Sequence, residues 1–294
     1  MKLKRKFILL ILILFTTFLV GCDEFFSFNT TTAHQMNLTT LPTAIDGTIT
    51  FEEIDYTSFS DYVSPTYSID DINEYNDHLE ETRDHIRHCN IQIQTTLFEM
   101  RYPHPLAQEQ QEYIVGNSSG SGFVFLEEDG YFYAITNFHV IDPQAYNSRY
   151  EIMTYADEEP QEATVVAYDE DYDLAVIKFE TLERTDVEIL NIYERLYTKF
   201  IHEELVFAIG NPLGVTNNVS FGEFKSMQDI DNTEFKVIYH DALIEEGSSG
   251  GALVDVDGNL LGVNAWGLDT PDEYSFAIPN YIVYVFLINN GVLD

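Results

Sequence analysis

The sequence predicts an all-β fold, a barrel or a sandwich, with one helix before the strands and one after them. From residue 90 onward, the chain carries about a dozen segments of four to eight residues that are rich in β-branched and aromatic residues, such as "GFVFLEE", "LAVIKFE" and "FKVIYH". Turn signals such as "EEDGY" at 127–131 and "DVDGN" at 255–259 separate these segments. Because no long helical pattern lies between them, we expect the strands to pack on one another. Twelve strands also suffice for two six-stranded barrels.

The two predicted helices flank this strand-rich region. Residues 68–89, "SIDDINEYNDHLEETRDHIRHC", place Ile72, Leu79 and Ile86 near helical spacing, which predicts a polar helix with a thin apolar stripe. The closing stretch "NYIVYVFLINNGVLD" follows Pro279, a residue that suits the first turn of a helix.

The N-terminus has the pattern of an export signal. Four basic residues in "MKLKRK" precede an apolar run from Phe7 to Val20, which is shorter than the roughly 20 residues of a spanning helix. The run ends in "LVGC", which resembles the lipobox of bacterial lipoproteins. The resemblance implies a signal peptide over 1–21 and a lipid on Cys22, which would place the protein at the cell membrane, facing outside the cytoplasm. An ordinary secretory signal is the alternative, and it also predicts an extracytoplasmic protein.

Composition predicts a tether and limits the partners. Residues 22–67 are rich in Thr, Ser, Asn and Asp and show no sustained periodicity, so we expect a flexible tether. Without the four basic residues of the signal, the formal net charge changes from −36 to −40. Such a charge repels nucleic acid and anionic lipid, so neither is an expected partner.

The stretch "IEEGSSGGALVDV" at 244–256 raises the question of a nucleophile, because two serines lie among glycines. A serine becomes a nucleophile only beside a base. Seven of the eight histidines, His240 among them, lie in the tether, the polar helix or charged connecting stretches, where a solvated surface position is expected. His139 differs because it ends a strand in "YAITNFHVI", so the sheet can hold it facing a cleft.

A carboxylate can accompany this serine and histidine. Asp173 directly precedes the apolar strand "LAVIKFE", so it can be half buried and accept a hydrogen bond from an imidazole N–H. Asp169 and Asp171 are expected to be ordinary loop carboxylates. The chain order His139, Asp173, Ser249 is that of the double-barrel serine proteases.

Six segments carry a resemblance to a family. "SSGSGFVF", "ITNFHVI", "DYDLAVIK", "AIGNPLG", "DALIEEGSSGGALVDVDGNLLGVN" and "SFAIPN" occur in the order found in HtrA/Deg-type trypsin-like serine proteases and cover roughly residues 90–290. The resemblance implies a protease domain over 90–294 built of two six-stranded antiparallel β-barrels. It assigns Ser249 as the nucleophile, His139 as the general base and Asp173 as the orienting acid. The main-chain N–H groups of Gly247 and Ser249 would form the oxyanion hole.

The same resemblance places the substrate pocket. Leu243, six residues before the nucleophile, would form an apolar floor, with Ile244, Asn264, Ala265 and Trp266 around it. We expect cleavage after small or medium apolar residues, although Trp266 equally suits core packing. Glu245 and Glu246 depart from the family pattern. We expect them to be solvated, and they could favour basic residues on the leaving side of the substrate.

The sequence therefore predicts a lipid-anchored, extracytoplasmic serine endopeptidase that acts on polypeptides. It needs no cofactor or metal, because the acidic clusters in "DEDYD" and "DVDG" lack a ligand set. No PDZ domain is expected after the protease domain, and the resemblance leaves room for a homo-oligomer. The alternative is a catalytically inactive surface lipoprotein of the same fold that binds peptides or host proteins.

Overall fold

The computed structural model describes residues 43–45, 48–50, 60–61, 72–141, 147–157, 159–182, 184–212, 217–230, 233, 235–267 and 275–293. All of them belong to one of the two units into which the chain divides, Met36–Asp294. The predicted signal peptide 1–21, Cys22 and most of the predicted tether 22–67 lie outside the described residues. Within 22–67 the structure describes three short strands, β1 (Thr43–Ile45), β2 (Thr48–Thr50) and β3 (Ser60–Asp61). Strands β1 and β2 pair antiparallel, and β3 pairs parallel with β10 (Thr198–Lys199).

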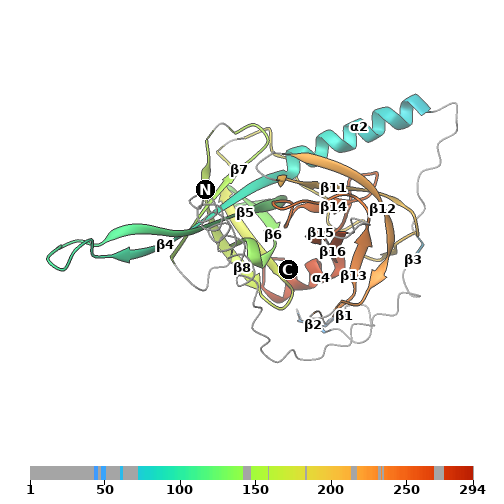
Figure 1. Cartoon of the computed structure of the whole chain (residues 1–294). Helices are drawn as coiled ribbons and strands as arrows, with labels where there is room; N and C mark the ends of the chain where they lie inside the picture. Colours follow the sequence, from blue (N-terminus) through green and yellow to red (C-terminus); the bar gives the residue numbers. More distant parts are fainter. Residues whose placement is uncertain are drawn as a thin grey trace, which may run out of the picture. The chain divides into compact units, whose positions relative to one another are not determined.

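Twelve strands form two closed barrels, which confirms the predicted fold class. Each barrel has six strands, and every neighbouring pair within a barrel is antiparallel. The first barrel, with the order β4-β5-β6-β9-β8-β7 (Figure 1), consists of β4 (Asn90–Arg101), β5 (Gln111–Glu128), β6 (Tyr131–Thr136), β7 (Asn147–Met153), β8 (Gln161–Asp169) and β9 (Leu174–Glu180). The second, with the order β11-β12-β13-β16-β15-β14, consists of β11 (Leu205–Gly210), β12 (Asn218–Gln228), β13 (Val237–His240), β14 (Ala252–Val254), β15 (Leu260–Gly267) and β16 (Ser275–Pro279).

Local turn chemistry sets the strand pairing. The turn between β5 and β6 is Asp129–Gly130, and both residues have positive φ, at 51° and 82°. Two consecutive left-handed residues are typical of the tight hairpin turn that an Asp-Gly pair favours. This turn fixes the register in which Glu128 faces Tyr131.

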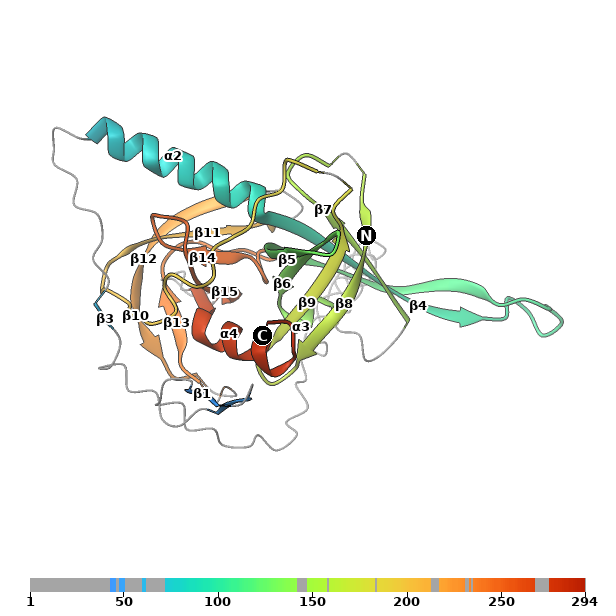
Figure 2. The same cartoon turned by 180° about the vertical axis from the view of Figure 1, so that it is seen from behind.

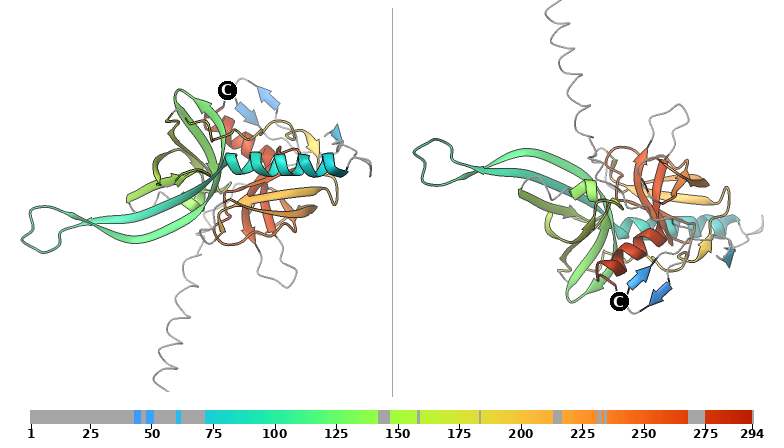
Figure 3. Two further views of the ribbon diagram at one scale, coloured as in Figure 1. Left: turned by 90° about the horizontal axis from the view of Figure 1, so that it is seen from above. Right: turned by 90° about the horizontal axis from the view of Figure 1, so that it is seen from below.

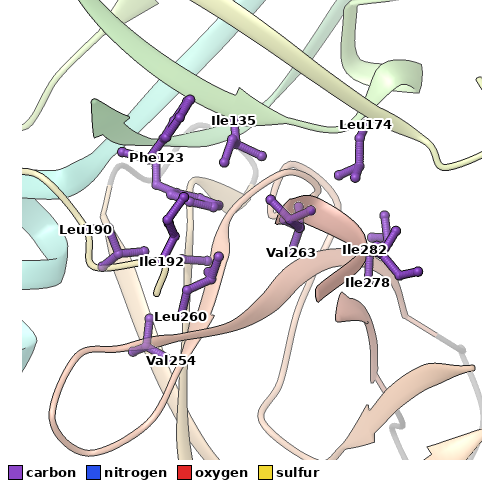
Figure 4. Close-up of a cluster of buried hydrophobic side chains, with 14 of the residues drawn as sticks. Phe123, Ile135, Leu174, Leu190, Ile192, Val254, Leu260, Val263, Ile278 and Ile282 are labelled. Carbon is purple, nitrogen blue, oxygen red and sulfur yellow. The ribbon is translucent and has the colours of Figure 1, made fainter. Parts of the chain in front are cut away.

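The hydrophobic core has three parts. One cluster fills the first barrel around Ile93, Val124 and Ile177, and a second fills the other barrel around Val206, Leu253 and Leu261. The third is shared by both barrels. Figure 4 shows Phe123, Ile135 and Leu174 of the first barrel on one side of it, with Val254, Leu260, Val263 and Ile278 of the second barrel and Ile282 of α4 on the other. Burial of this shared apolar surface holds the barrels together.

The two flanking helices are present. Helix α4 (Asn280–Asn289) starts directly after Pro279, and its buried apolar residues pack against the shared core. Figure 2 shows this helix from behind. Helix α2 (Ile72–Cys89) runs beside the second barrel (Figure 3). Two side chains attach this helix to the rest of the protein: His78 Nε2 lies 2.9 Å from Asp257 Oδ1, and Thr82 Oγ1 donates a hydrogen bond to Val256 O at 2.8 Å.

Strands β4 and β5 continue beyond the first barrel as a two-stranded arm, visible in Figures 1 and 3. Pairing of β4 with β7 stops at Phe98, whereas pairing with β5 continues to Arg101. The arm bears large exposed apolar side chains, namely Met100, Tyr102, Leu106, Tyr113, Ile114 and Val115. In the part of the chain that the structure describes, no helix has the length and hydropathy to span a membrane.

Candidate active site

His139 lies on a short helix that is anchored in the first barrel. Helix α3 (Phe138–Ile141) begins two residues after β6 ends, and Phe138, Val140 and Ile141 are buried. The side chain of His139 keeps 29% of its surface accessible. The buried neighbours therefore fix the backbone of His139, while its imidazole remains accessible to solvent.

Asp173 accepts hydrogen bonds from both the ring and the main chain of His139. The ring Nδ1 lies 2.8 Å and 3.0 Å from the two carboxylate oxygens of Asp173, and His139 N–H donates to Oδ1 at 3.0 Å. Because a carboxylate can only accept, Nδ1 carries the proton and Nε2 is left with a free lone pair. That is the tautomer of a general base.

The backbone of Asp173 is strained and held in place. Its φ is 52°, in the left-handed region that non-glycine residues rarely adopt. Asn137 Nδ2 donates to Asp173 O at 2.9 Å, and Asp169 Oδ1 shapes the turn by accepting from the N–H groups of Asp171 and Tyr172. Strain of this kind at a functional position persists because the surrounding bonds over-determine it.

The same carboxylate controls the charge of the ring. Burial lowers the pKa of His139, but the negative charge of Asp173 and its hydrogen bond outweigh burial, so the pKa of His139 is raised above its ordinary value. Asp173 thus stabilises the imidazolium that forms when the ring takes a proton.

Ser249 lies on the loop between β13 and β14 and is held against the first barrel. Ser249 O accepts a hydrogen bond from Ser121 N at 2.7 Å, and a Cβ added at Gly250 would lie 3.1 Å from Asn137 N, two residues before His139. The hydroxyl of Ser249 donates to Ala265 O at 3.1 Å and, within the described residues, makes no hydrogen bond with His139. Catalytic hydrogen bonds are often unformed in ligand-free enzymes.

Within the described residues, two main-chain N–H groups between Gly247 and Gly251 have no hydrogen-bond partner. Ser248 N donates to Glu245 O, Gly250 N to Asn264 O, and Gly251 N to Ser248 O, at 2.8–3.0 Å. Within the described residues, the N–H groups of Gly247 and Ser249 donate to nothing. Both donors assigned to the oxyanion hole are therefore available to a ligand. Gly247 has a φ of 98°, which suits glycine.

Comparison with known proteins agrees with this arrangement. Residues 120–263 match the trypsin-like peptidase domain family. The chain is 35% identical over 179 residues to serine protease HTRA4 of Mus musculus, covering 59% of this chain and 34% of that protein. It is 31% identical over 195 residues to the serine protease Do-like HtrA of Lactococcus lactis, covering 60% of this chain and 46% of that protein.

Solved structures give the same result. A serine endoprotease from Yersinia pestis matches with a TM-score of 0.53 and 25% identity, over 78% of this chain and 68% of that chain. An HtrA-type protease with a decapeptide matches with a TM-score of 0.57 and 25% identity, over 72% of this chain and 67% of that chain. These similarities support an HtrA-type, trypsin-like serine protease. The chain spans about a third of the mouse relative's length and under half of the Lactococcus relative's length.

The residues assigned to the substrate pocket lie at different depths. Leu243 is 46% exposed and Ile244 is half-buried. Asn264 and Ala265 are buried beside the nucleophile loop, and Trp266 is described only by its backbone pairing with Phe276. Glu245 and Glu246 are both exposed, in agreement with the expected solvated positions.

The expected surface position of His240 is wrong. This side chain is fully buried in the second barrel, because it alternates along β13 with the half-buried Tyr239 and precedes the exposed Asp241. Within the described residues, neither ring nitrogen makes a hydrogen bond of good geometry, and Asn264 Oδ1 is likewise buried without one. Burial lowers the pKa of His240 to about 4, so the ring is neutral at pH 7. The charged Asp241 in "YHDA" makes this segment look like an exposed connection, although the alternation along β13 places His240 on the buried face.

Two further buried residues lie at the nucleophile loop. Ser121 makes hydrogen bonds to the loop, and Asn211 makes hydrogen bonds to Ser121. Both lie in segments that resemble the family, but no feature of those segments predicts the contact across 90 positions. Among the described residues, no group of three or more His, Cys, Asp or Glu side chains could hold a metal ion. Burial and the nearby charge of Glu188 raise the pKa of the Cys89 thiol, which keeps it protonated.

Proposed function

We propose that the chain is a lipid-anchored, extracytoplasmic serine endopeptidase that hydrolyses polypeptides. The observation that carries the proposal is the His139–Asp173 pair, joined by hydrogen bonds from both the ring and the main chain of His139, together with a nucleophile loop in which the Gly247 and Ser249 N–H groups have no partner among the described residues. The similarity to HtrA-type serine proteases supports it.

The reaction uses these groups in turn. His139 Nε2 takes the proton of Ser249 as Oγ attacks the peptide carbonyl, and the carbonyl electrons move to the oxygen. That oxyanion is stabilised by the N–H groups of Gly247 and Ser249. The protonated His139, held by Asp173, gives its proton to the leaving amine, and an acyl-enzyme remains on Ser249. Water, deprotonated by His139, then releases the acid product and restores the serine.

Cleavage after small or medium apolar residues is the second part of the proposal. The apolar side chains of Leu243, Ile244 and Ala265, with Trp266, support it, and Glu245 with Glu246 would favour basic residues on the leaving side. A peptide library digested with the protein should show Val, Ile, Leu or Ala before the cut. A preference for Lys or Arg before the cut would contradict this specificity.

Lipid attachment at Cys22 is the third part. The motif "LVGC" after a charged and an apolar region supports it. An alkyne-bearing fatty acid fed to cells should label the wild-type protein in the membrane fraction and leave Cys22→Ser unlabelled. Equal labelling of both proteins would contradict a lipid on Cys22.

A fluorophosphonate probe tests the activity itself. The probe should label the wild-type protein, and labelling should vanish in Ser249→Ala. Ser248→Ala is the matched control, because it removes the neighbouring hydroxyl and should keep the label. A folded wild-type protein that stays unlabelled between about pH 5 and pH 9 would refute the proposed activity.

A further inference from the structure

Ser121 joins the first barrel to the nucleophile loop through two hydrogen bonds. This residue lies on β5 and is fully buried. Its N–H donates to Ser249 O at 2.7 Å, and its Oγ donates to Gly247 O at 2.7 Å. Thr136 Oγ1 donates to Ser121 O at 2.7 Å and so holds the Ser121 peptide in turn. One buried residue thus binds the carbonyl oxygens of both residues assigned to the oxyanion hole, Gly247 and Ser249.

Asn211 fixes the direction of the Ser121 proton. Its main-chain N–H donates to Ser121 Oγ at 2.8 Å, and its Nδ2 donates to the same oxygen at 3.0 Å. A hydroxyl has one proton and two lone pairs. Because both lone pairs of Ser121 Oγ receive Asn211 donors, its only proton must point at Gly247 O.

The orientation of the Asn211 amide is itself determined. Nδ2 also donates to Ile91 O at 2.9 Å, and Oδ1 accepts from Asn217 N–H at 2.9 Å and from Asn90 Nδ2 at 3.1 Å. A flipped amide would bring an acceptor to Ile91 O and a donor to Asn217 N–H. The network therefore admits one arrangement, and it is buried throughout.

These bonds restrict the peptide planes on either side of the free donors. Gly247 O and Ser249 O are held by Ser121, and Ser248 O accepts from Gly251 N–H. Gly247 has no Cβ to limit rotation, so without the bond to its carbonyl this part of the loop can turn more freely. A rotated loop would no longer aim both N–H groups at one oxyanion.

We propose that Ser121 is a positioning residue for the oxyanion donors Gly247 and Ser249, and that Asn211 orients it. The inference rests on the proposed peptidase function. Ser121 should affect the stability of the transition state, because the oxyanion develops only in that state. Peptide binding in the ground state should depend on Ser121 much less.

The test compares Ser121→Ala with Thr82→Val in the full chain. Thr82 is the matched control, because its buried hydroxyl also donates to a main-chain carbonyl, Val256 O at 2.8 Å, in the connection between β14 and β15. Three quantities are measured: the rate constant of fluorophosphonate acylation, the affinity for a peptide boronate, and the affinity for a product-like peptide.

Ser121→Ala should be acylated about ten- to a hundredfold more slowly and should lose boronate affinity, while product-peptide affinity stays within about twofold. Thr82→Val should match wild type in all three measurements. Wild-type acylation by Ser121→Ala, or an equal loss of boronate and product-peptide affinity, would overturn the inference. If Ser121→Ala is insoluble, Ser121→Cys, a weaker donor, should give an intermediate acylation rate, and a wild-type rate there would equally overturn it.

Failure of the proposed function gives a different result. In that case the folded wild-type protein itself is not acylated. The positioning role is then read from amide hydrogen exchange: residues 246–250 should exchange faster in Ser121→Ala than in wild type and Thr82→Val. Unchanged exchange would overturn it.

Discussion

The Asp173 carboxylate binds His139 twice, through the ring Nδ1 and through the main-chain N–H. The second bond fixes where the carboxylate lies, and the first fixes which ring nitrogen is protonated. Replacing one Asp173 carboxylate oxygen by an amide nitrogen keeps the shape of the side chain. It removes the negative charge beside the His139 ring and the acceptor for its Nδ1 proton.

Asp173→Asn should lower kcat by about a thousand- to ten-thousandfold with little change in KM. The amide presents a donor to Nδ1, which favours the wrong tautomer of His139. Asp171→Asn is the matched control, because this exposed neighbour touches the site only through the turn, and it should keep wild-type kinetics. Steady-state kinetics on a cleaved peptide measure both. A loss under tenfold for Asp173→Asn would argue against an orienting role.

The pH dependence of acylation follows from the raised pKa of His139. The ring must be neutral to accept the Ser249 proton, so the second-order rate constant should rise with pH and reach half its maximum above pH 6.5. In Asp173→Asn the attraction is lost and burial remains, so the midpoint should move down. A wild-type midpoint at or below pH 6.5 would contradict the described environment of His139.

Much of the fold was predictable because the relevant signals are local. The Asp129–Gly130 turn and the β-branched segments specify antiparallel hairpins directly, and twelve strands close into two barrels. The candidate triad was assigned from its chain order and from the segments that resemble the family. In the structure His139 lies on α3, which follows β6, instead of ending a strand, Asp173 directly precedes β9, and Ser249 lies on the loop between β13 and β14. The contact of Ser121 with Gly247 joins residues 126 positions apart. Such a contact depends on how the two barrels dock, which no local pattern encodes.

Burial of His240 was not predictable from its polar neighbourhood, and it has a consequence for stability. Its folded-state pKa of about 4 lies below the unfolded value of 6.5, so between these pH values the unfolded chain binds the extra proton. Stability should therefore fall as pH drops through this window, by up to about 3 kcal/mol from this group.

His240→Asn should reduce the fall in unfolding free energy with decreasing pH, because the asparagine side chain does not titrate. The free energy of urea unfolding is measured at several pH values from about 7 to 4.5, and the slope is compared rather than the absolute value. His202→Asn, at a histidine whose side chain is 70% exposed, is the control and should keep the wild-type slope. The same slope for His240→Asn and wild type would contradict a neutral buried ring.

Two glycines with similar backbones but different surroundings give the next prediction. Gly250 and Gly130 have φ values of 86° and 82°. A Cβ at Gly250 would lie 2.2 Å from Ser121 O and 2.4 Å from Thr136 Oγ1, whereas a Cβ at Gly130 meets nothing within 4 Å. Gly130→Ala should cost only the left-handed penalty, about 1–2 kcal/mol, and keep fluorophosphonate labelling. Gly250→Ala should lose labelling because the loop must move from the first barrel, and wild-type labelling of that variant would contradict the close approach.

Arg195 lies in the segment between the barrels and bears a buried charge with two acidic partners. Its guanidinium lies 3.0 Å from Asp255 Oδ2 and 3.1 Å from Glu204 Oε2, and its side chain is 1% exposed. Arg195→Met should lower the free energy of unfolding by about 3–5 kcal/mol, because it leaves two buried carboxylates without their cation. Urea denaturation measures this loss.

The exposed pair of Arg149 and Glu112 provides the control. Their N–O distance is 2.8 Å, but the Arg149 side chain is 40% exposed, so Arg149→Met should cost no more than about 1 kcal/mol. Burial raises the pKa of Glu204 in spite of the opposing charge of Arg195, so this carboxylate takes up a proton at a higher pH than an ordinary glutamate. The penalty of Arg195→Met should therefore shrink as pH falls, since a protonated Glu204 no longer needs a cation. Equal losses for the two variants, or a penalty for Arg195→Met that grows toward acid pH, would show that the loss does not come from unpaired buried charge.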